Sequence, residues 1–348
     1  MQERDISYDL LRLVACIGVI VIHVGGKISG GYSDEADFIT GLARYAVPCF
    51  LMISGKFLLV KEENSDAGWF YNKEYRKLFP PMLVYSIIGV LFTTGKAVMN
   101  GGSLFSPFKN WLFGRPYYRL WYLYTLAGVY ILVPGIIRIK QSLSKKAYII
   151  LGILWFCASC VSAPFCSFRL AWGVHTVACF SSWFVIGDII GNRKKKISKF
   201  STVLLLLVSI VCSVLTGLWE VCQNYVQPDS VVNYINASNN FSPTVALGSI
   251  ALFSSVKGWN AKCNVYCLTK HSLSIYLAHA FFLEFFDWIY RICFASGSNP
   301  LLWVVCCTAA TFYVSYLWSK CTAFLTEVVY TKIDVAVGKV FIQTKRQY

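Results

Sequence analysis

Residues 7–24 read SYDLLRLVACIGVIVIHV, an apolar run that carries Arg12 near one end and His23 near the other. A helix needs about 20 mainly apolar residues to cross the hydrocarbon core of a bilayer, so this run predicts a membrane span. An ionisable side chain inside such a span is costly, and by default it marks a functional site. Arg12 and His23 are therefore the first candidate functional residues of the chain.

The rest of the 348-residue chain has the composition of a polytopic membrane protein. It is 56% hydrophobic and only 14% charged, whereas soluble domains carry about 25% charged residues. Long apolar runs recur along its whole length. The sequence therefore predicts an all-α, polytopic transmembrane helix bundle that forms a single membrane-embedded domain, residues 1–348. About ten spans are expected, at 9–24, 40–60, 79–98, 120–137, 147–165, 173–191, 201–219, 242–256, 272–291 and 301–326.

Lysine and arginine concentrate in alternate connections between these spans. The segments 61–78 and 192–199 are basic, whereas 25–39 and 220–241 together contain a single basic residue; 99–119 is the exception to the pattern. Because cytoplasmic connections carry the excess of Lys and Arg, we expect both termini in the cytoplasm, which agrees with an even number of spans. The net charge of +15 thus predicts a lipid bilayer as partner, and no nucleic acid.

Arg12 and His23 lie eleven residues apart, about three helical turns, so they share one stripe of the first helix roughly 16 Å apart. Two ordinary explanations exist: Arg12 extends to the interface while paired with Asp9, and His23 is a hydrated residue at a helix end. The functional alternative is a polar path through the bundle. Arg12 would then hold a phosphate or carboxylate, and His23 would act as a general base.

Further polar residues lie in and after the second span. Arg44 and Ser54 are inside it, and a bent packing helix accounts for both. Lys73, Arg76 and Lys77 precede the third span, and anchoring at the cytoplasmic surface accounts for them. A basic cluster at the mouth of a cavity would also suit the phosphates of a nucleotide-like donor, so these three residues are candidates for donor binding.

Five segments, in order along the chain, carry a resemblance to a known family. The first is the R-x10-H pattern of Arg12 and His23. The chain resembles acyltransferase family 3, the bacterial integral membrane O-acyltransferases that modify surface glycans. The other four segments are RYAVPCFLMISGKFLL (44–59), LWYLYTLAGVYILVPGI (120–136), WFVIGDIIG (183–191) and HSLSIYLAHAFFL (271–283).

The resemblance implies an enzyme of a bacterial inner or plasma membrane. It would take an acyl group, most often acetyl, from cytoplasmic acyl-CoA and pass it to a hydroxyl of a cell-envelope glycan or lipid-linked sugar. His23 matches the essential histidine of the family and Arg12 its essential arginine. Lys73 and Arg76 match a basic R-x-x-R pair in which Lys replaces the first Arg, a change that keeps the charge but loses the bidentate fork.

The chemistry of acyl transfer fits these residues. A base must take the proton of the acceptor hydroxyl, and imidazole titrates in the right range. No GxSxG motif occurs, so transfer is expected either directly from CoA or through His23. Acyl-CoA is expected as a co-substrate, with no bound cofactor and no metal. Residues expected to line the pocket, unless they serve helix packing alone, are Asp9, Arg44, Ser54, Trp121, Tyr124, Tyr276 and His279.

Two other classes of function remain open from the sequence. One is a transporter or export component, for an amino acid or a polysaccharide, built on the same fold. The other is a structural membrane subunit, which would leave Arg12 and His23 unexplained. CoA-dependent turnover would indicate the enzyme, and substrate counterflow without CoA would indicate the transporter.

Overall fold

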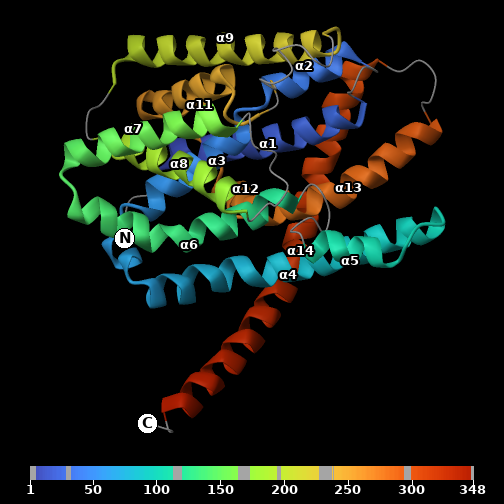
Figure 1. Cartoon of the computed structure of the whole chain (residues 1–348). Coiled ribbons are helices and arrows are strands. Elements are labelled where there is room, and N and C mark those ends of the chain that lie inside the picture. Colours follow the sequence, from blue (N-terminus) through green and yellow to red (C-terminus); the bar gives the residue numbers. More distant parts are fainter. Residues whose placement is uncertain are drawn as a thin grey trace.

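The computed structural model describes residues 5–28, 33–112, 120–163, 173–193, 197–226, 237, 239–293 and 299–345, without the side chains of 76, 112, 290, 291, 293 and 323–345. All regular secondary structure within these ranges is helical, as the apolar runs predict. Figure 1 shows the helices gathered in one bundle, from which the last part of the C-terminal helix projects.

The helices match the expected spans closely in position. The long ones are α1 (Ile6–Ile28), α3 (Ala46–Leu58), α4 (Ala67–Met99), α6 (Trp121–Ser142), α7 (Lys145–Ser162), α8 (Val174–Gly191), α9 (Lys199–Gln223), α11 (Pro243–Ser255), α13 (Ser272–Cys293) and α14 (Pro300–Lys345). The short ones are α2 (Asp34–Leu42), α5 (Phe105–Leu112), α12 (Tyr266–Thr269) and the 3-10 turns η1 (Glu62–Ser65) and η4 (Val256–Gly258).

Eight segments of the described chain are long and apolar enough to cross a membrane. One of them combines α2 with α3, so the second expected span is broken at residues 43–45. The remaining two expected spans correspond to α11 and α13. The first is a helix of only 13 residues, and the second is 22 residues long but carries Glu284 and Asp287.

The contacts between helices give the direction in which three of them run. Arg12, Lys77 and Ser272, from the first halves of α1, α4 and α13, line one cavity. In the second halves of these helices, Lys27 and Glu284 form an ion pair of 2.5 Å, and Lys96 of α4 also pairs with Glu284. The three helices therefore run in the same direction, as the first, third and ninth of ten spans must. This agreement supports counting both α11 and α13 as spans, while the side of the membrane on which the termini lie stays a prediction.

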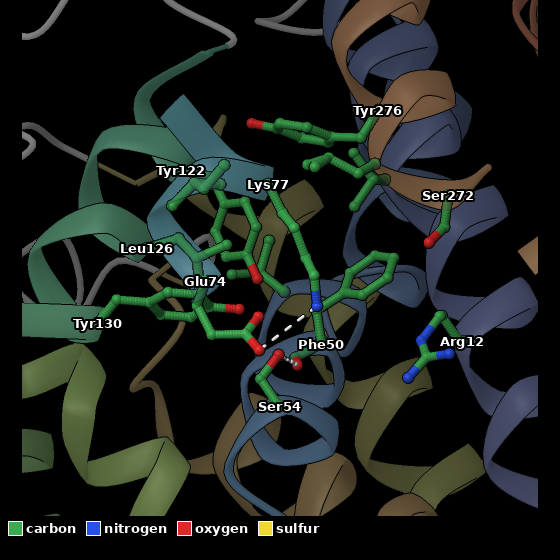
Figure 2. A pocket seen from close by; sticks show the side chains of 14 residues that line it. Arg12, Phe50, Ser54, Glu74, Lys77, Tyr122, Leu126, Tyr130, Ser272 and Tyr276 are labelled. Atoms are coloured by element: carbon green, nitrogen blue, oxygen red, sulfur yellow. Dashed lines mark hydrogen bonds and ion pairs between the residues drawn. The ribbon is translucent and has the colours of Figure 1, made fainter. Parts of the chain in front are cut away.

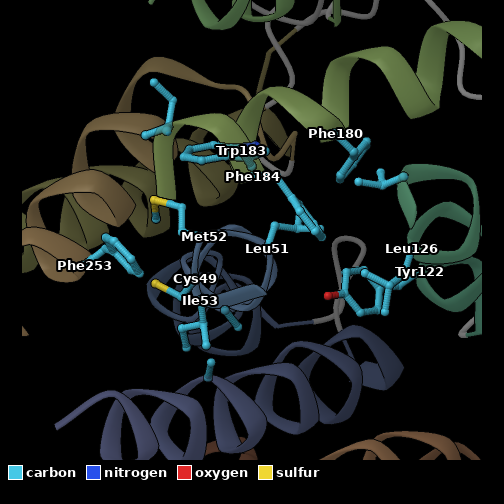
Figure 3. Packing of buried hydrophobic residues seen from close by; sticks show 14 of the residues in the cluster. Cys49, Leu51, Met52, Ile53, Tyr122, Leu126, Phe180, Trp183, Phe184 and Phe253 are labelled. Atoms are coloured by element: carbon cyan, nitrogen blue, oxygen red, sulfur yellow. The ribbon is translucent and has the colours of Figure 1, made fainter. Parts of the chain in front are cut away.

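The core of the bundle lies where α3 crosses α8 at very short range. A Cβ atom built on Gly187 would lie 2.1 Å from the carbonyl oxygen of Met52, and one built on Gly55 would lie 2.1 Å from that of Phe184. Glycine on both helices thus lets the two backbones touch, as small residues do in membrane bundles. Figure 3 shows Leu51 and Met52 facing α8 across this contact, with Cys49 and Ile53 on the side toward α1.

The crossing gives a direct test of the fold. We expect Gly187→Ala to lower the apparent Tm of the detergent-solubilised protein by more than about 5 °C, because the added methyl overpacks two rigid backbones. Gly135→Ala is the matched control, since Gly135 also lies in a helix but nothing approaches its Cβ position within 4 Å. Equal Tm values for the two variants would contradict the close crossing.

Candidate active site

Arg12 of α1 is paired with Asp9 and also lines a cavity inside the bundle, two positions that the sequence offered as alternatives. Its Nη1 atom lies 3.0 Å from Oδ1 of Asp9, one turn earlier on the same helix, and Asp9 is buried. The ion pair does not remove Arg12 from the interior of the bundle, because its side chain also lines a cavity. Asp9 therefore holds the guanidinium in place at the wall of that cavity.

The cavity has a volume of 260 Å³ and is lined by residues of five helices. Figure 2 shows the side chains around it, with Arg12 entering from α1 and Tyr130 from α6. Ser54 of α3 is also part of the wall, but its hydroxyl donates to the Phe50 carbonyl at 2.9 Å. The lining residues are Arg12, Val19, Val47, Phe50, Ser54, Glu74, Lys77, Leu78, Tyr122, Leu126, Tyr130, Ser272, Leu273 and Tyr276.

The charges in this cavity are concentrated on α1 and α4. Arg12 contributes one cation, and Lys77 of α4 contributes another, whose Nζ lies 3.5 Å from Oε1 of Glu74. The opposite wall, from α6 and α13, presents the side chains of Tyr122 and Tyr276. The cavity thus combines a side with two ion-paired cations, whose N–H groups can also donate to an anionic ligand, with an aromatic side that carries hydroxyl groups.

His23 lies outside this cavity and stacks on a second histidine. The rings of His23 on α1 and His279 on α13 are 5.2 Å apart between centroids, with 28° between their planes. His279 is fully buried, and its Nδ1 is hydrogen-bonded to the carbonyl of Tyr276. Because a carbonyl only accepts, Nδ1 must carry the hydrogen, so in the neutral ring Nε2 is the acceptor. The buried ring of His279 thus has a defined tautomer, and it holds the half-buried ring of His23 from another helix.

Tyr276 connects the cavity to the histidine pair. It lines the cavity, and its ring centroid is 5.5 Å from that of His279 and 5.5 Å from that of Tyr122. A continuous series of aromatic contacts therefore leads from the cavity wall through Tyr276 to His279 and His23. Arg12 lies at the cavity end of this series, and His23 lies at the other end, stacked on His279. Both residues share one stripe of α1.

The comparison with known proteins adds the class of chemistry. The model of the acyltransferase domain of acyltransferase family 3 matches residues 5–320. The chain belongs to acyltransferase family 3. It is thus an acyltransferase and a multi-pass membrane protein, and the matched region contains both the cavity and the histidine pair. No curated protein and no solved structure matches the chain.

The residues proposed to bind the donor of this acyltransferase lie at different places on α4. Lys77 lines the cavity. Lys73, one turn earlier, lies with Nζ 4.0 Å from the ring centroid of Trp69, which is a cation–π contact on the same helix. The Arg76 side chain is outside the described part of the structure. Of the three, Lys77 therefore has the position best suited to contact a ligand in the cavity.

Three other residues expected to line the pocket are engaged elsewhere in the acyltransferase. Arg44, in the break between α2 and α3, pairs with Glu220 of α9, with 2.5 Å between Nε and Oε1. Trp121 packs edge-on against Phe180, with 5.5 Å between ring centroids. The Tyr124 hydroxyl is hydrogen-bonded to Ser86 at 2.5 Å. None of these three is among the residues that line the cavity.

Sequence reasoning did not single out several charged residues that the acyltransferase uses. Glu74 and Glu220 are the partners of Lys77 and Arg44. Glu284 and Asp287 were overlooked although they carry a readable signal. They repeat the i, i+3 spacing of Tyr276 and His279 eight residues further along the same helix, about two turns, so all four lie toward one side of it. A repeated polar stripe of this kind in an apolar helix indicates contacts inside the bundle.

The Arg44–Glu220 pair allows a structural role to be separated from ligand binding. We expect Arg44→Met to lower the Tm by several degrees, because it leaves the buried Glu220 carboxylate without its cation. In the double variant Arg44→Met/Glu220→Leu, most of the Tm should return, since both charges are removed together. Thermal unfolding in detergent is the measurement. A double variant as unstable as the single one would show that the pair is not what Arg44 contributes.

Proposed function

We propose that this protein is an O-acyltransferase that moves an acyl group, most simply acetyl, from acyl-CoA to a hydroxyl of a cell-envelope glycan or lipid-linked sugar. Family membership supports the acyl transfer. The observation that supports the rest is the contact series from a cavity lined by Arg12 and Lys77 to the stacked rings of His279 and His23. Such a series supports a site with a charged ligand at one end and a general base at the other.

The donor fits the cationic end of this site. CoA carries phosphate groups, and Lys77 and Arg12 are the cations at the wall of the cavity. A space of 260 Å³ is below the range of about 300–1,000 Å³ in which drug-sized ligands bind, so it accommodates the thioester end of the donor and not the nucleotide. The nucleotide would remain at the surface, near Lys73 and the beginning of α4. The positive-inside pattern of the sequence predicts that this surface faces the cytoplasm, where acyl-CoA is available.

The histidine pair supplies the proton chemistry. In the direct route, His23 takes the proton of the acceptor hydroxyl while the oxygen attacks the thioester carbonyl and the new C–O bond forms. The oxyanion then collapses, the C–S bond breaks, and the CoA thiolate receives the proton from His23. Tyr122 and Tyr276 provide hydroxyl donors on the adjoining wall, where negative charge on the carbonyl oxygen needs to be stabilised. The stacked His279 fixes the position of the His23 ring.

The proposal is tested by single-turnover kinetics on purified protein in detergent. CoA release from labelled acetyl-CoA is followed with an extract of envelope glycans as acceptor. We expect His23→Ala to slow transfer by about a hundredfold or more, the usual contribution of a general base. His175→Ala is the control, because His175 is another intramembrane histidine, but it contacts Cys179 in α8.

The other outcomes of this experiment are equally informative. CoA release without acceptor, with label retained on the wild-type protein but not on His23→Ala, indicates an acyl-histidine route. If acetyl-CoA, succinyl-CoA and longer acyl-CoAs all fail with wild type, the enzyme proposal is wrong. Substrate counterflow would then test the transporter.

Arg12 gives a second prediction, specific to the donor. Arg12→Gln should raise KM for acyl-CoA by about tenfold or more, because it removes a cation at the cavity wall, whereas Arg12→Lys should retain part of the affinity. Steady-state kinetics with varied acyl-CoA and fixed acceptor provides the measurement. An unchanged donor KM in Arg12→Gln would exclude a role for Arg12 in holding the donor.

A further inference from the structure

A second cavity lies between α4 and α13, beyond the histidine pair as seen from the first. Its volume is 460 Å³, and it is walled by aromatic rings and charged groups together. Phe92 of α4 packs edge-on against Phe281 of α13, with 6.0 Å between ring centroids, and this pair forms one side. The remaining lining residues are Lys96, Glu284, Phe285, Asp287 and Trp288.

The charges of this second cavity form an ion-pair group shared by three helices. Oε1 of Glu284 lies 2.5 Å from Nζ of Lys27, and its Oε2 lies 2.8 Å from Nζ of Lys96. Asp287 is 3.5 Å from the same Lys27. The carboxylates accept hydrogen bonds and the lysines donate them. The cavity therefore offers both kinds of partner that the hydroxyl groups of a sugar require.

The position of this group relates it to the histidine pair. Lys27 follows His23 by one helical turn, about 6 Å along α1, and Glu284 follows His279 by five residues, about 8 Å along α13. The first cavity contacts the pair from the opposite direction, through Tyr276. The histidines thus lie between two cavities: the first is lined by Arg12 and Lys77 with tyrosines, and the second by Phe and Trp rings with the ion-pair group.

The second cavity is open to the surroundings of the bundle at the level of α13. Trp288 is 60% exposed and Phe285 is 53% exposed, although both belong to a helix in the position of an expected span. In Figure 1 the second halves of α4 and α13 lie at the same side of the bundle. Around a transmembrane helix the surroundings at this level are lipid, and aromatic side chains of this kind favour the interface between lipid and water.

From these observations we infer that the cavity between α4 and α13 binds the sugar headgroup of a lipid-linked acceptor. The inference rests on the proposed function. The sugar ring packs on Trp288 and Phe92, its hydroxyls bond to Glu284, Asp287 and Lys96, and the lipid chain remains in the bilayer. One hydroxyl of the bound sugar then points along α1 toward His23, while the thioester approaches from the first cavity.

The test separates acceptor binding from donor binding. Initial rates of transfer from labelled acetyl-CoA are measured against graded amounts of an envelope-glycan extract, divided into a chloroform–methanol-soluble fraction and a water-soluble fraction. Trp288→Ala should raise the apparent KM for the lipid-soluble fraction by at least about tenfold, because an aromatic face at the site is lost. The KM for acetyl-CoA should stay unchanged.

Two variants serve as controls. Trp288→Phe should restore most of the affinity for the acceptor. Ile292→Ala should behave as wild type, because Ile292 is an exposed residue one turn further along that does not line the cavity.

Each result decides the matter. A wild type that transfers acyl groups while Trp288→Ala shows an unchanged acceptor KM overturns the inference and leaves the proposed function intact. Label that enters only the water-soluble fraction overturns the lipid-linked acceptor. A wild type without transfer from any acyl-CoA overturns the proposed function, and the inference falls with it. If Trp288→Ala does not fold, Asp287→Asn replaces it with the same expected shift in acceptor KM.

Discussion

The stacking of His23 on His279 is the contact on which the rest of the site depends. It joins the second half of α1 to the first half of α13, two helices that run in the same direction. On one side of it the two helices share the wall of the first cavity, and on the other side Lys27 and Glu284 tie them together. Helices α4 and α13 line both cavities, and the contact brings the imidazole of α1 between them. The two cavities thus become two approaches to one pair of imidazoles.

Polar groups inside a membrane bundle are costly unless they are paired, and the pairing here follows that constraint. Asp9 neutralises Arg12, Glu220 neutralises Arg44, and Glu284 is bonded to two lysines. Every one of these pairs except the first joins helices that are distant in the sequence. Charge pairing therefore also fixes which helices are neighbours. The glycine-mediated crossing of α3 and α8 then supplies the rigid core against which the site is held.

Much of the fold was predictable because each membrane span is recognised from one continuous apolar run of residues. Apolar runs predicted where the helices lie, and the spacing of Arg12 and His23 predicted which face of α1 is directed toward the site. The interhelical partners were not predictable, because contacts between distant residues leave no periodic signal: nothing in the sequence pairs His23 with His279, or Arg44 with Glu220. For the same reason Trp121 and Tyr124 were expected at a pocket, whereas the structure gives them packing contacts beside it.

The proposed acyl transfer requires the acyl end of the donor to reach the histidine pair at Tyr276. The measurement that tests it most directly is a cryo-EM structure of the protein with a non-reactive thioether analogue of acetyl-CoA. We expect phosphates near Lys77, the sulfur inside the first cavity, and the acetyl end against Tyr276 on the side of His279. An analogue bound in the cavity between α4 and α13, or with its acetyl end turned away from Tyr276, would contradict it.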